Sequence, residues 1–433
     1  MRTRKVFKVT HLKSFKNSLL NWGNEHDEAV WLDSNQHRGN YSSFDAVLAV
    51  DGLTAITTDH TNAFDDLKEY QSQTRDWIFG YLSYDLKNDT EDLKSQNRDG
   101  LKFPDLYFFQ PKKIIKLIGN QAEFLYLNMV SEEIQTDYDH IVNNETITNS
   151  PMATGDIHIK MRIFKDEYFK KVAKMLEHIY QGNIYEANFC QEFYAADVIL
   201  DALNVYKELN KISKSPFATY VKLFDKYIIS ASPERYLKKI GYKIISQPIK
   251  GTAPRALDKV EDEHLKNNLQ KDEKERAENI MIVDLVRNDL SKTAQKGSVA
   301  VDELCKAYSF EQVHQMISTV TSHMKEGTHP VDVIKESFPM GSMTGAPKIA
   351  AMNIIEALES FKRGVYSGAV GYFTPDSDFD FNVVIRTVLY NETERYLSYS
   401  VGSAITAKSI PIKEYEECLV KAKAMRSVLE KKY

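Results

Sequence analysis

The chain has 433 residues, too many for one small hydrophobic core, so we expect one large two-lobed unit or two domains. Its 56 Lys and Arg residues and 61 Asp and Glu residues give a net charge of −5, which argues against nucleic acid or a membrane surface as the partner. No secretory signal follows the charged first residues and no stretch is long enough to span a bilayer, so a cytoplasmic protein is expected.

The N-terminal part alternates short aromatic-rich segments with polar turns, which predicts a sheet-rich lobe over residues 1–150. Strands are expected at 29–32, 46–50, 77–84, 106–109 and 113–118. Residues 131–155 contain few large apolar side chains and predict a boundary or a long loop. A second domain is therefore expected over residues 155–433.

From Lys165 the apolar residues recur at helical spacing, and helices then alternate with strands. Helices are expected at 165–182, 202–212, 271–286, from 348 onward, and at 412–430, the last with Leu419 among its inward side chains. Strands are expected at 184–190, 218–223, 227–230, 236–245, 367–373, 381–390 and 396–401. The mixture predicts a strand-rich α+β protein.

The three cysteines are widely separated and suit neither a zinc site nor a disulfide framework. They are Cys190, Cys305 and Cys418. Because none has the small-residue elbow of a cysteine nucleophile, we expect no thiol glutaminase site in this chain.

Lys250 is the first candidate for chemistry. It precedes Gly251, lies between Pro248 and Pro254, and has Arg255 nearby, which is expected to disfavour the protonated lysine. Such a lysine acts as a nucleophile if burial lowers its pKa. The alternative is an ordinary solvated surface charge.

Two pairs of carboxylates are the second candidate. Glu275 and Glu278 share one face at the entry to the apolar run 280–286, which is apolar nearly all round and is expected to be buried. Glu414 and Glu417 form a similar pair on the last predicted helix. Two facing pairs would suit a hard divalent cation such as Mg²⁺. The alternative is that Glu417 and Lys421 form an ordinary surface ion pair.

The segment FPMGSMTGAPK, at 338–348, lacks the spacing of a phosphate loop. It predicts a Gly-rich helix start whose backbone N–H groups suit a carboxylate or phosphate, or simply a helix-start loop. Arg386 is expected within the strand 381–390, either exposed at an edge or paired with a buried anion. His314, in an apolar run, is typical of a core histidine with its hydrogen bonds satisfied.

Together these motifs resemble the chorismate-utilising enzymes, the family of the anthranilate, aminodeoxychorismate, isochorismate and salicylate synthases. The motifs are SPER (232–235), PIKGTAPR (248–255), KERAENIMIVDLVRNDLS (274–291), VHQMIST (313–319), FPMGSMTGAPK (338–348), RGVYSGAVGY (363–372), IRT (385–387) and KEYEECLVKA (413–422). They cover about residues 160–430 in order, whereas the first 150 residues resemble the family only through GYLSYDL (80–86). The resemblance implies an α+β fold of two packed antiparallel sheets with outer helices, and a site in the cleft between lobes.

Lys250 distinguishes branches of this family, since anthranilate synthases read PIAGT where aminodeoxychorismate synthases read PIKGT, as this chain does. The resemblance implies that Lys250 attacks C2 of chorismate as the C4 hydroxyl leaves. Ammonia then displaces the lysine by attack at C4, which gives 4-amino-4-deoxychorismate for 4-aminobenzoate and folate synthesis. The alternatives are an anthranilate synthase component I, which aminates C2 and expels pyruvate, and a non-catalytic regulator.

The resemblance also assigns the other site residues. Glu234 is implied as the general acid for the departing hydroxyl, and Mg²⁺ is implied on Glu278 and Glu417 with Glu275 and Glu414 in support. The implied substrate contacts are Gly251, Thr252, His314, Thr344, Gly345, Tyr366, Arg386, Gly402 and Ser403. Ammonia is expected from a separate glutaminase subunit.

Two positions depart from the family pattern. Glu186 stands where the water-adding isochorismate and salicylate synthases have a lysine base, which argues against their chemistry. Ala404 stands where the family more often has glycine, so its added methyl is expected to tighten or distort the pocket.

Overall fold

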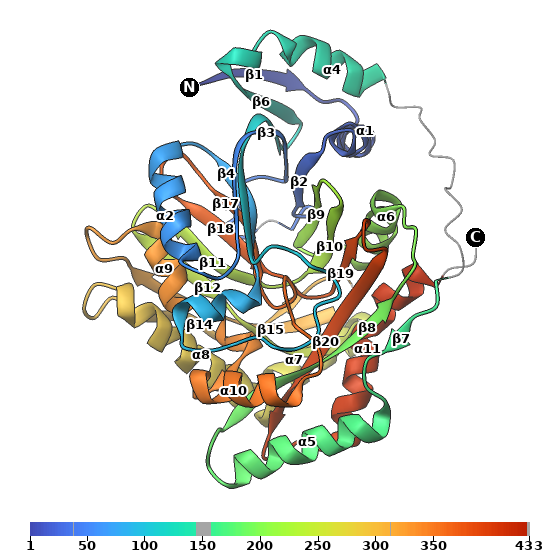
Figure 1. Cartoon of the computed structure of the whole chain (residues 1–433), viewed down its shortest axis with the longest axis vertical. Coiled ribbons are helices and arrows are strands. Elements are labelled where there is room, and N and C mark those ends of the chain that lie inside the picture. The colour runs from blue at the N-terminus through green and yellow to red at the C-terminus, as the bar shows by residue number, and fades with distance from the viewer. Residues whose placement is uncertain (38, 144–156, 312, 431–433) are drawn as a thin grey trace.

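The computed structural model describes residues 1–37, 39–143, 157–311 and 313–430. Its strands pair antiparallel throughout the described residues. Hydrogen-bonded neighbours connect all of them, and they are arranged as two sheets (Figure 1). The predicted α+β class and the two antiparallel sheets are therefore confirmed.

The first sheet contains the strands that carry most of the outer helices. Its order is β8 (Glu186–Ala195), β20 (Tyr396–Thr406), β19 (Thr387–Asn391), β10 (Lys226–Ser232), β9 (Phe217–Leu223), β2 (Glu28–Asp33), β3 (Ala46–Thr58), β5 (Leu106–Ile118), β6 (Gln121–Leu127) and β1 (Arg2–Lys8). The short strands β7 (Lys160–Met161) and β16 (Gly345–Ala346) also pair with β8.

The second sheet begins at the other half of β5. Its order is β4 (Ile78–Leu82), β17 (Ala369–Phe373), β18 (Phe379–Val383), β11 (Arg235–Ile240), β12 (Lys243–Gln247) and β15 (Val313–His323). Strand β15 also pairs with β13 (Ile249–Pro254) and β14 (Ala300–Ser309).

The long strands β3 and β5 belong to both sheets and join them. The register between them shifts near Gly52, beside Asp51 with its φ of 62°, so the pair bends there. The sequence predicted two strands where β5 is one, because Gln110 and Pro111 interrupt its apolar pattern opposite this bend. The predicted strand 46–50 is only the first part of β3.

Alternating side chains of the first sheet enter two different cores. In β9, Val221 and Leu223 join the core shared with the second sheet, whereas Ala218 and Tyr220 face the core beneath the outer helices. Helices α1 (Leu12–Asn24), α4 (Glu133–Asn143), α5 (Lys165–Tyr180), α6 (Ala202–Ser213) and α11 (Pro411–Leu429) cover this outer core.

Of the remaining helices, α7 (Lys259–Lys271) and α8 (Glu273–Thr293) pack against β13, β14 and β15 of the second sheet, whereas α10 (Lys348–Leu358) packs on β8 and β16 and joins the outer core. The others are α2 (Ala63–Thr74), α3 (Lys87–Thr90) and α9 (Pro330–Ser337), with 3₁₀ turns η1 (Tyr84–Leu86), η2 (Asn128–Val130) and η3 (Gly341–Met343). Across the described ranges, no helix has the length and apolarity needed to cross a membrane.

Three sequence expectations need correction. Helix α8 is not buried all round, because Ile280 is 38% exposed and Asp284 is exposed, while Ile282 and Val283 pack inward. Helix α4 occupies part of the predicted loop 131–155, of which residues 144–156 lie outside the described residues. Leu419, expected to face inward, is 37% exposed.

The division at residue 150 stays a prediction. Strands from both sides of it pair directly, as β2 does with β9 and β4 with β17.

Candidate active site

Strand β13 brings Lys250 against helix α8. The strand has a register shift between Ile249 and Thr252, and Gly251 within it has a φ of 86°, which favours glycine. A Cβ at Gly251 would lie 3.0 Å from Oε2 of Glu275 on α8. Glycine therefore allows the lysine-bearing strand to approach the helix that carries the predicted metal ligands.

The Lys250 ammonium forms an ion pair with Glu186 of β8. Lys250 Nζ lies 3.2 Å from Glu186 Oε1, and the two side chains are 13% and 2% exposed. Burial lowers the pKa of Lys250, but the carboxylates of Glu186, Glu278 and Glu234 outweigh it and leave the pKa raised. The expectation that the surroundings would disfavour the protonated lysine is therefore wrong. Arg255 does not act on it, because its guanidinium pairs with Asp262.

Glu234 lies in the turn between β10 and β11. Its backbone carbonyl accepts a 3.0 Å hydrogen bond from Val383, which fixes the turn against β18. Burial raises the pKa of its carboxyl to about 7, although Ser342 hydrogen-bonds to it and the Lys250 and Arg386 cations oppose the shift. An acid with this pKa can hold a proton near neutral pH and donate it.

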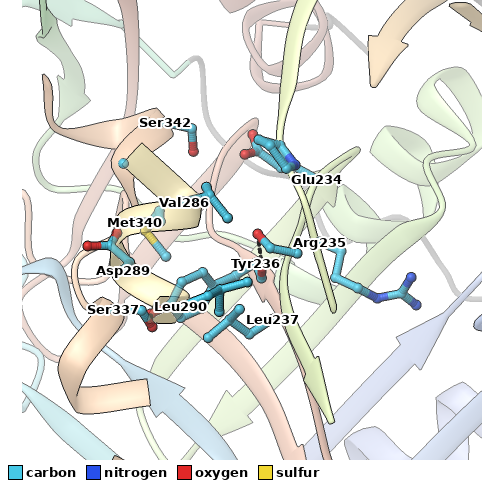
Figure 2. Close-up of a pocket in the computed structure, with 13 residues that line it drawn as sticks. Glu234, Arg235, Tyr236, Leu237, Val286, Asp289, Leu290, Ser337, Met340 and Ser342 are labelled. Carbon is cyan, nitrogen blue, oxygen red and sulfur yellow. Dashed lines mark hydrogen bonds between the residues drawn. The ribbon is translucent and has the colours of Figure 1, made fainter. Parts of the chain in front are cut away.

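A cavity of about 20 Å³ lies beside Glu234, which is enough for one water molecule and too small for a ring-sized substrate. Figure 2 shows Glu234 and Ser342 at one end of it, with the Arg235 side chain directed away. Arg235 is bound to Asp380 at 2.9 Å, so its charge is already neutralised.

Arg386 does not lie within a strand as expected. It falls between β18 and β19 with a φ of 51°, because the predicted strand 381–390 is interrupted there. Its guanidinium has no hydrogen-bond or ion-pair partner among the described residues, and burial lowers its pKa while Glu234 opposes this change. A partly buried arginine without a partner is suited to bind an incoming carboxylate.

The two predicted carboxylate pairs meet around Lys274. Its Nζ lies 3.7 Å from Glu278 Oε1 and 4.0 Å from Glu414 Oε1. Burial raises the pKa of Glu278 to about 7, despite the Lys250 and Lys274 cations. Burial also raises the pKa of Glu275.

Glu417 forms the ion pair that was the alternative interpretation, with Lys421 at 2.7 Å. Burial would raise its pKa, but Lys421 and Lys274 outweigh that effect and leave the pKa lowered. The pair is partly exposed, so it adds little to stability.

The carboxylate cluster, formed by Glu275, Glu278, Glu414 and Glu417, has the chemistry of a site for a hard cation, but its side chains do not converge on one point. Oε1 of Glu278 is buried and has no hydrogen-bond partner among the described residues. All four side chains offer carboxylate oxygens, which Mg²⁺ prefers. In the described part of the chain, no three His, Cys, Asp or Glu side chains converge tightly enough to hold a metal. The donor chemistry therefore fits Mg²⁺, while Lys274 supplies the positive charge in this arrangement.

The loop from 338 to 348 lies directly against Glu186. The carbonyls of Thr344 and Ala346 accept hydrogen bonds from the backbone N–H groups of Asn188 and Tyr185. A Cβ at Gly345 would lie 2.1 Å from the Glu186 carbonyl, so only glycine allows this approach. The Thr344 hydroxyl donates within its own loop.

A buried ion pair supports the loop from 338 to 348. Arg363 pairs with Glu359 at 2.6 Å and also donates to the carbonyls of Met343 and Asn188. Lys348, the last residue of the motif, pairs with buried Asp289 at 2.6 Å, which leaves it no role as a free phosphate ligand.

Strand β20 places Gly402 beside Cys190 of β8. A Cβ at Gly402 would lie 2.5 Å from Cys190 Sγ, and the Tyr366 hydroxyl lies 3.7 Å from the same sulfur. Lys421 donates to the Gly402 carbonyl at 2.8 Å. Ser403 lies two residues after Val401 and so on the same face of β20, which turns to the outer helices, and it therefore offers the site only its backbone.

Two predicted substrate contacts, Thr252 and His314, lie at the edge of the candidate site. Thr252 is exposed on β13. His314 is buried, and its ring nitrogens contact Ser309 at 3.0 Å and Asp262 at 2.9 Å. These contacts match a satisfied core histidine, and its substrate contact stays a prediction.

Four contributors were absent from the sequence-predicted site. Glu186 was noted only as a departure from the family, Lys421 only as a surface ion-pair partner of Glu417, and Ser342 and Lys274 were given no role of their own. Lys274 and Lys421 were detectable, since each stands four residues from a predicted metal ligand. The approach of Glu186 and Ser342 depends on tertiary contacts.

Comparison with known proteins gives a consistent result. The family described as chorismate binding enzyme matches residues 27–427. "Aminodeoxychorismate synthase component 1" of Bacillus subtilis is 33% identical over 362 residues, covering 81% of this chain and 76% of that protein. "Anthranilate synthase component 1" of Thermus thermophilus is 32% identical over 360 residues, covering 82% and 77%.

A longer relative and a solved structure agree with these matches. "Probable aminodeoxychorismate synthase, chloroplastic" of Oryza sativa is 34% identical over 402 residues, but this chain spans only 44% of its length. The crystal structure of anthranilate synthase component I from Streptococcus pneumoniae has a TM-score of 0.75 and 26% identity, covering 90% of this chain and 94% of that one. The chain therefore belongs to the family of chorismate binding enzymes.

Proposed function

We propose that this protein aminates chorismate at C4 with ammonia to give 4-amino-4-deoxychorismate. The observation that carries the proposal is Lys250, held 3.2 Å from Glu186 and close to Glu234, whose pKa is raised to about 7. A nucleophilic amine and a proton donor are the two groups that this substitution needs. The relatives named aminodeoxychorismate synthase support the same reaction.

Each step uses a residue of the cluster. The neutral amine of Lys250 attacks C2 of chorismate, and the C4 hydroxyl departs as water with the proton of Glu234. Ammonia then attacks C4, the C2–N bond breaks, and Lys250 leaves as an amine. The unpartnered guanidinium of Arg386 binds a substrate carboxylate and holds C2 toward the lysine.

Magnesium is part of the proposal. Glu278 and Glu417 would hold the ion, with Glu275 and Glu414 in support, and the buried oxygen of Glu278 that has no hydrogen-bond partner among the described residues favours this assignment. When bound, Mg²⁺ would neutralise the substrate carboxylate that enters the acidic cluster.

A separate glutaminase subunit is proposed as the ammonia source. The name of the Bacillus subtilis relative, component 1, supports a second component. Free ammonium is expected to replace the subunit in a purified assay.

The test is product identification by mass spectrometry after incubation with chorismate, Mg²⁺ and ammonium. We expect 4-amino-4-deoxychorismate from the wild type and none from Lys250→Ala, with at least about a 10³-fold loss of rate. Lys292→Ala, an exposed lysine on α8, serves as the matched control. Unchanged product formation by Lys250→Ala would reject the nucleophile.

The second candidate is an anthranilate synthase component I. It is favoured by the Thermus thermophilus relative and by the Streptococcus pneumoniae structure. Fluorescent anthranilate and free pyruvate in the same incubation would identify it. No turnover of chorismate under any condition would instead favour a non-catalytic regulator.

A further inference from the structure

One buried carboxylate has no role in the steps above, and it contacts the nucleophile. Glu186 is 1% exposed, and its Oε1 accepts the hydrogen bond from Lys250. Its second oxygen, Oε2, is buried without a hydrogen-bond partner among the described residues. A buried carboxylate with one free oxygen is costly to keep unless it has a function.

The fold fixes Glu186 in this place. It begins β8, with β16 on one side and Thr406 of β20 on the other. Alternation along β8 sends Ala187 and Phe189 into the outer core, so Glu186 points to the opposite face, where β13 carries Lys250. The carboxylate is therefore aimed at the lysine by two strand pairings.

We propose that Glu186 is a positioning residue that holds Lys250 in place and stores its proton during each turnover. This inference rests on the amination proposed above. Before attack, Lys250 transfers one proton from Nζ to Glu186, which gives a neutral amine and a neutral carboxylic acid. The amine then forms the bond to C2.

The number of protons taken up and released balances over one catalytic cycle. Glu234 donates its proton to the departing hydroxyl, and ammonia keeps its three protons on the new C4 ammonium. When the C2–N bond breaks, Lys250 leaves as a neutral amine and recovers its proton from Glu186. Glu234 takes a proton from solvent, so chorismate, ammonia and one proton give the aminated product and water.

Several carboxylates affect the pKa of Lys250. Those acting on Lys250 are Glu186, Glu234, Glu275, Glu278 and Glu417. Among the described residues, Glu186 is the one carboxylate in ion-pair contact with the ammonium, at 3.2 Å. Removing its charge is therefore expected to have a larger effect on Lys250 than a change elsewhere in the cluster.

The experiment measures Lys250 directly and then the reaction. The full chain is labelled with trace acetic anhydride across pH 6–11, and acetylation of Lys250 is quantified by peptide mass spectrometry. In Glu186→Gln, Lys250 is expected to react about tenfold or more faster at pH 8 than in the wild type, because the carboxylate no longer holds its proton. Glu186→Asp, which keeps the charge, is expected to restore part of the protection.

Glu192→Gln is the matched control, since Glu192 is a buried carboxylate on the same strand that binds Arg162 and Tyr396 instead. It is expected to leave the Lys250 labelling curve unchanged. Circular dichroism and Tm confirm that each variant folds. A Lys250 labelling curve in Glu186→Gln that matches the wild type would overturn the inference.

The pH dependence of amination distinguishes two roles of Glu186, which are to store the proton of Lys250 and only to hold Lys250 in place. With Glu186→Gln, Lys250 must lose its proton to solvent, so kcat/KM for amination should fall about tenfold per pH unit below the labelling midpoint. The pH profile of kcat/KM for the wild type should not show this fall. If the wild type and Glu186→Gln have equal pH profiles, Glu186 does not store the proton. A labelling shift without aminodeoxychorismate formation by the wild type would instead reject the proposed function and leave the pairing intact.

Discussion

Replacing Glu234 by glutamine should lower activity and raise stability, and the stability gain should depend on pH. Burial raises the pKa of Glu234 from 4.5 to about 7. Between these pH values the folded state binds more protons than the unfolded state, so stability falls as pH rises and the loss is complete above pH 7. At about 1.4 kcal/mol per pKa unit, the loss is roughly 3 kcal/mol.

Glutamine carries no charge at any pH, so Glu234→Gln should escape this loss. Unfolding entropy of about 2 cal/mol/K per residue over this chain converts 3 kcal/mol into a Tm gain of roughly 3 °C at pH 8. Near pH 4.5 the two proteins should have similar Tm values. Loss of the proton donor should lower kcat by about 10²- to 10⁴-fold.

Differential scanning fluorimetry at pH 5 and pH 8, together with the ammonium-dependent assay, measures both effects. Glu394→Gln, an exposed carboxylate paired with Lys102, makes the same charge change on the surface and should show no such pH dependence. A Tm difference that is equal at the two pH values, or activity within tenfold of the wild type, would refute the reasoning.

Two further variants test substrate and metal binding. Arg386→Ala removes the partly buried guanidinium that has no partner among the described residues, so kcat/KM for chorismate should fall about 10- to 100-fold, as expected for a hydrogen bond to a charged group, while the KM for ammonium stays unchanged. An unchanged kcat/KM would exclude Arg386 from substrate binding. Glu278→Gln should raise the Mg²⁺ concentration for half-maximal activity by about tenfold or more, because a proposed ligand loses its charge. A wild type that remains fully active in excess EDTA would exclude the metal.

The local sequence pattern predicted most elements whose periodicity is simple. Helix α5 was expected from Lys165, where the structure begins it, and α6 and β9 differ from their predicted ranges by at most one residue. Errors occurred where tertiary context breaks a pattern. Opposite the bend of β3 near Gly52, two predicted strands form one continuous strand, β5, and the turn at Arg386 divides one predicted strand into β18 and β19.

The charged site illustrates the same limit. Spacing alone indicated that Glu275 and Glu278 share a helix face, and α8 shows this face turned toward α11. Spacing did not indicate that Lys274 would lie between the two pairs, or that Arg255 would bind Asp262 rather than act on Lys250.

By itself, the sequence determined the chemistry available to this protein: a lysine beside a Gly-Thr turn, an acid in SPER, and two carboxylate pairs. Only the tertiary structure decided the ionisation of these groups, because pKa values depend on burial and on charges that are distant in sequence. Arg255 was expected to disfavour the protonated form of Lys250, yet the pairing of β8 with β16 and β20 brings Glu186 to the lysine and favours its protonated form. Burial raises the pKa of Glu234 to about 7 and so favours its neutral form. Burial lowers the pKa of Lys250, but the carboxylates of Glu186, Glu278 and Glu234 outweigh this effect and leave the pKa raised.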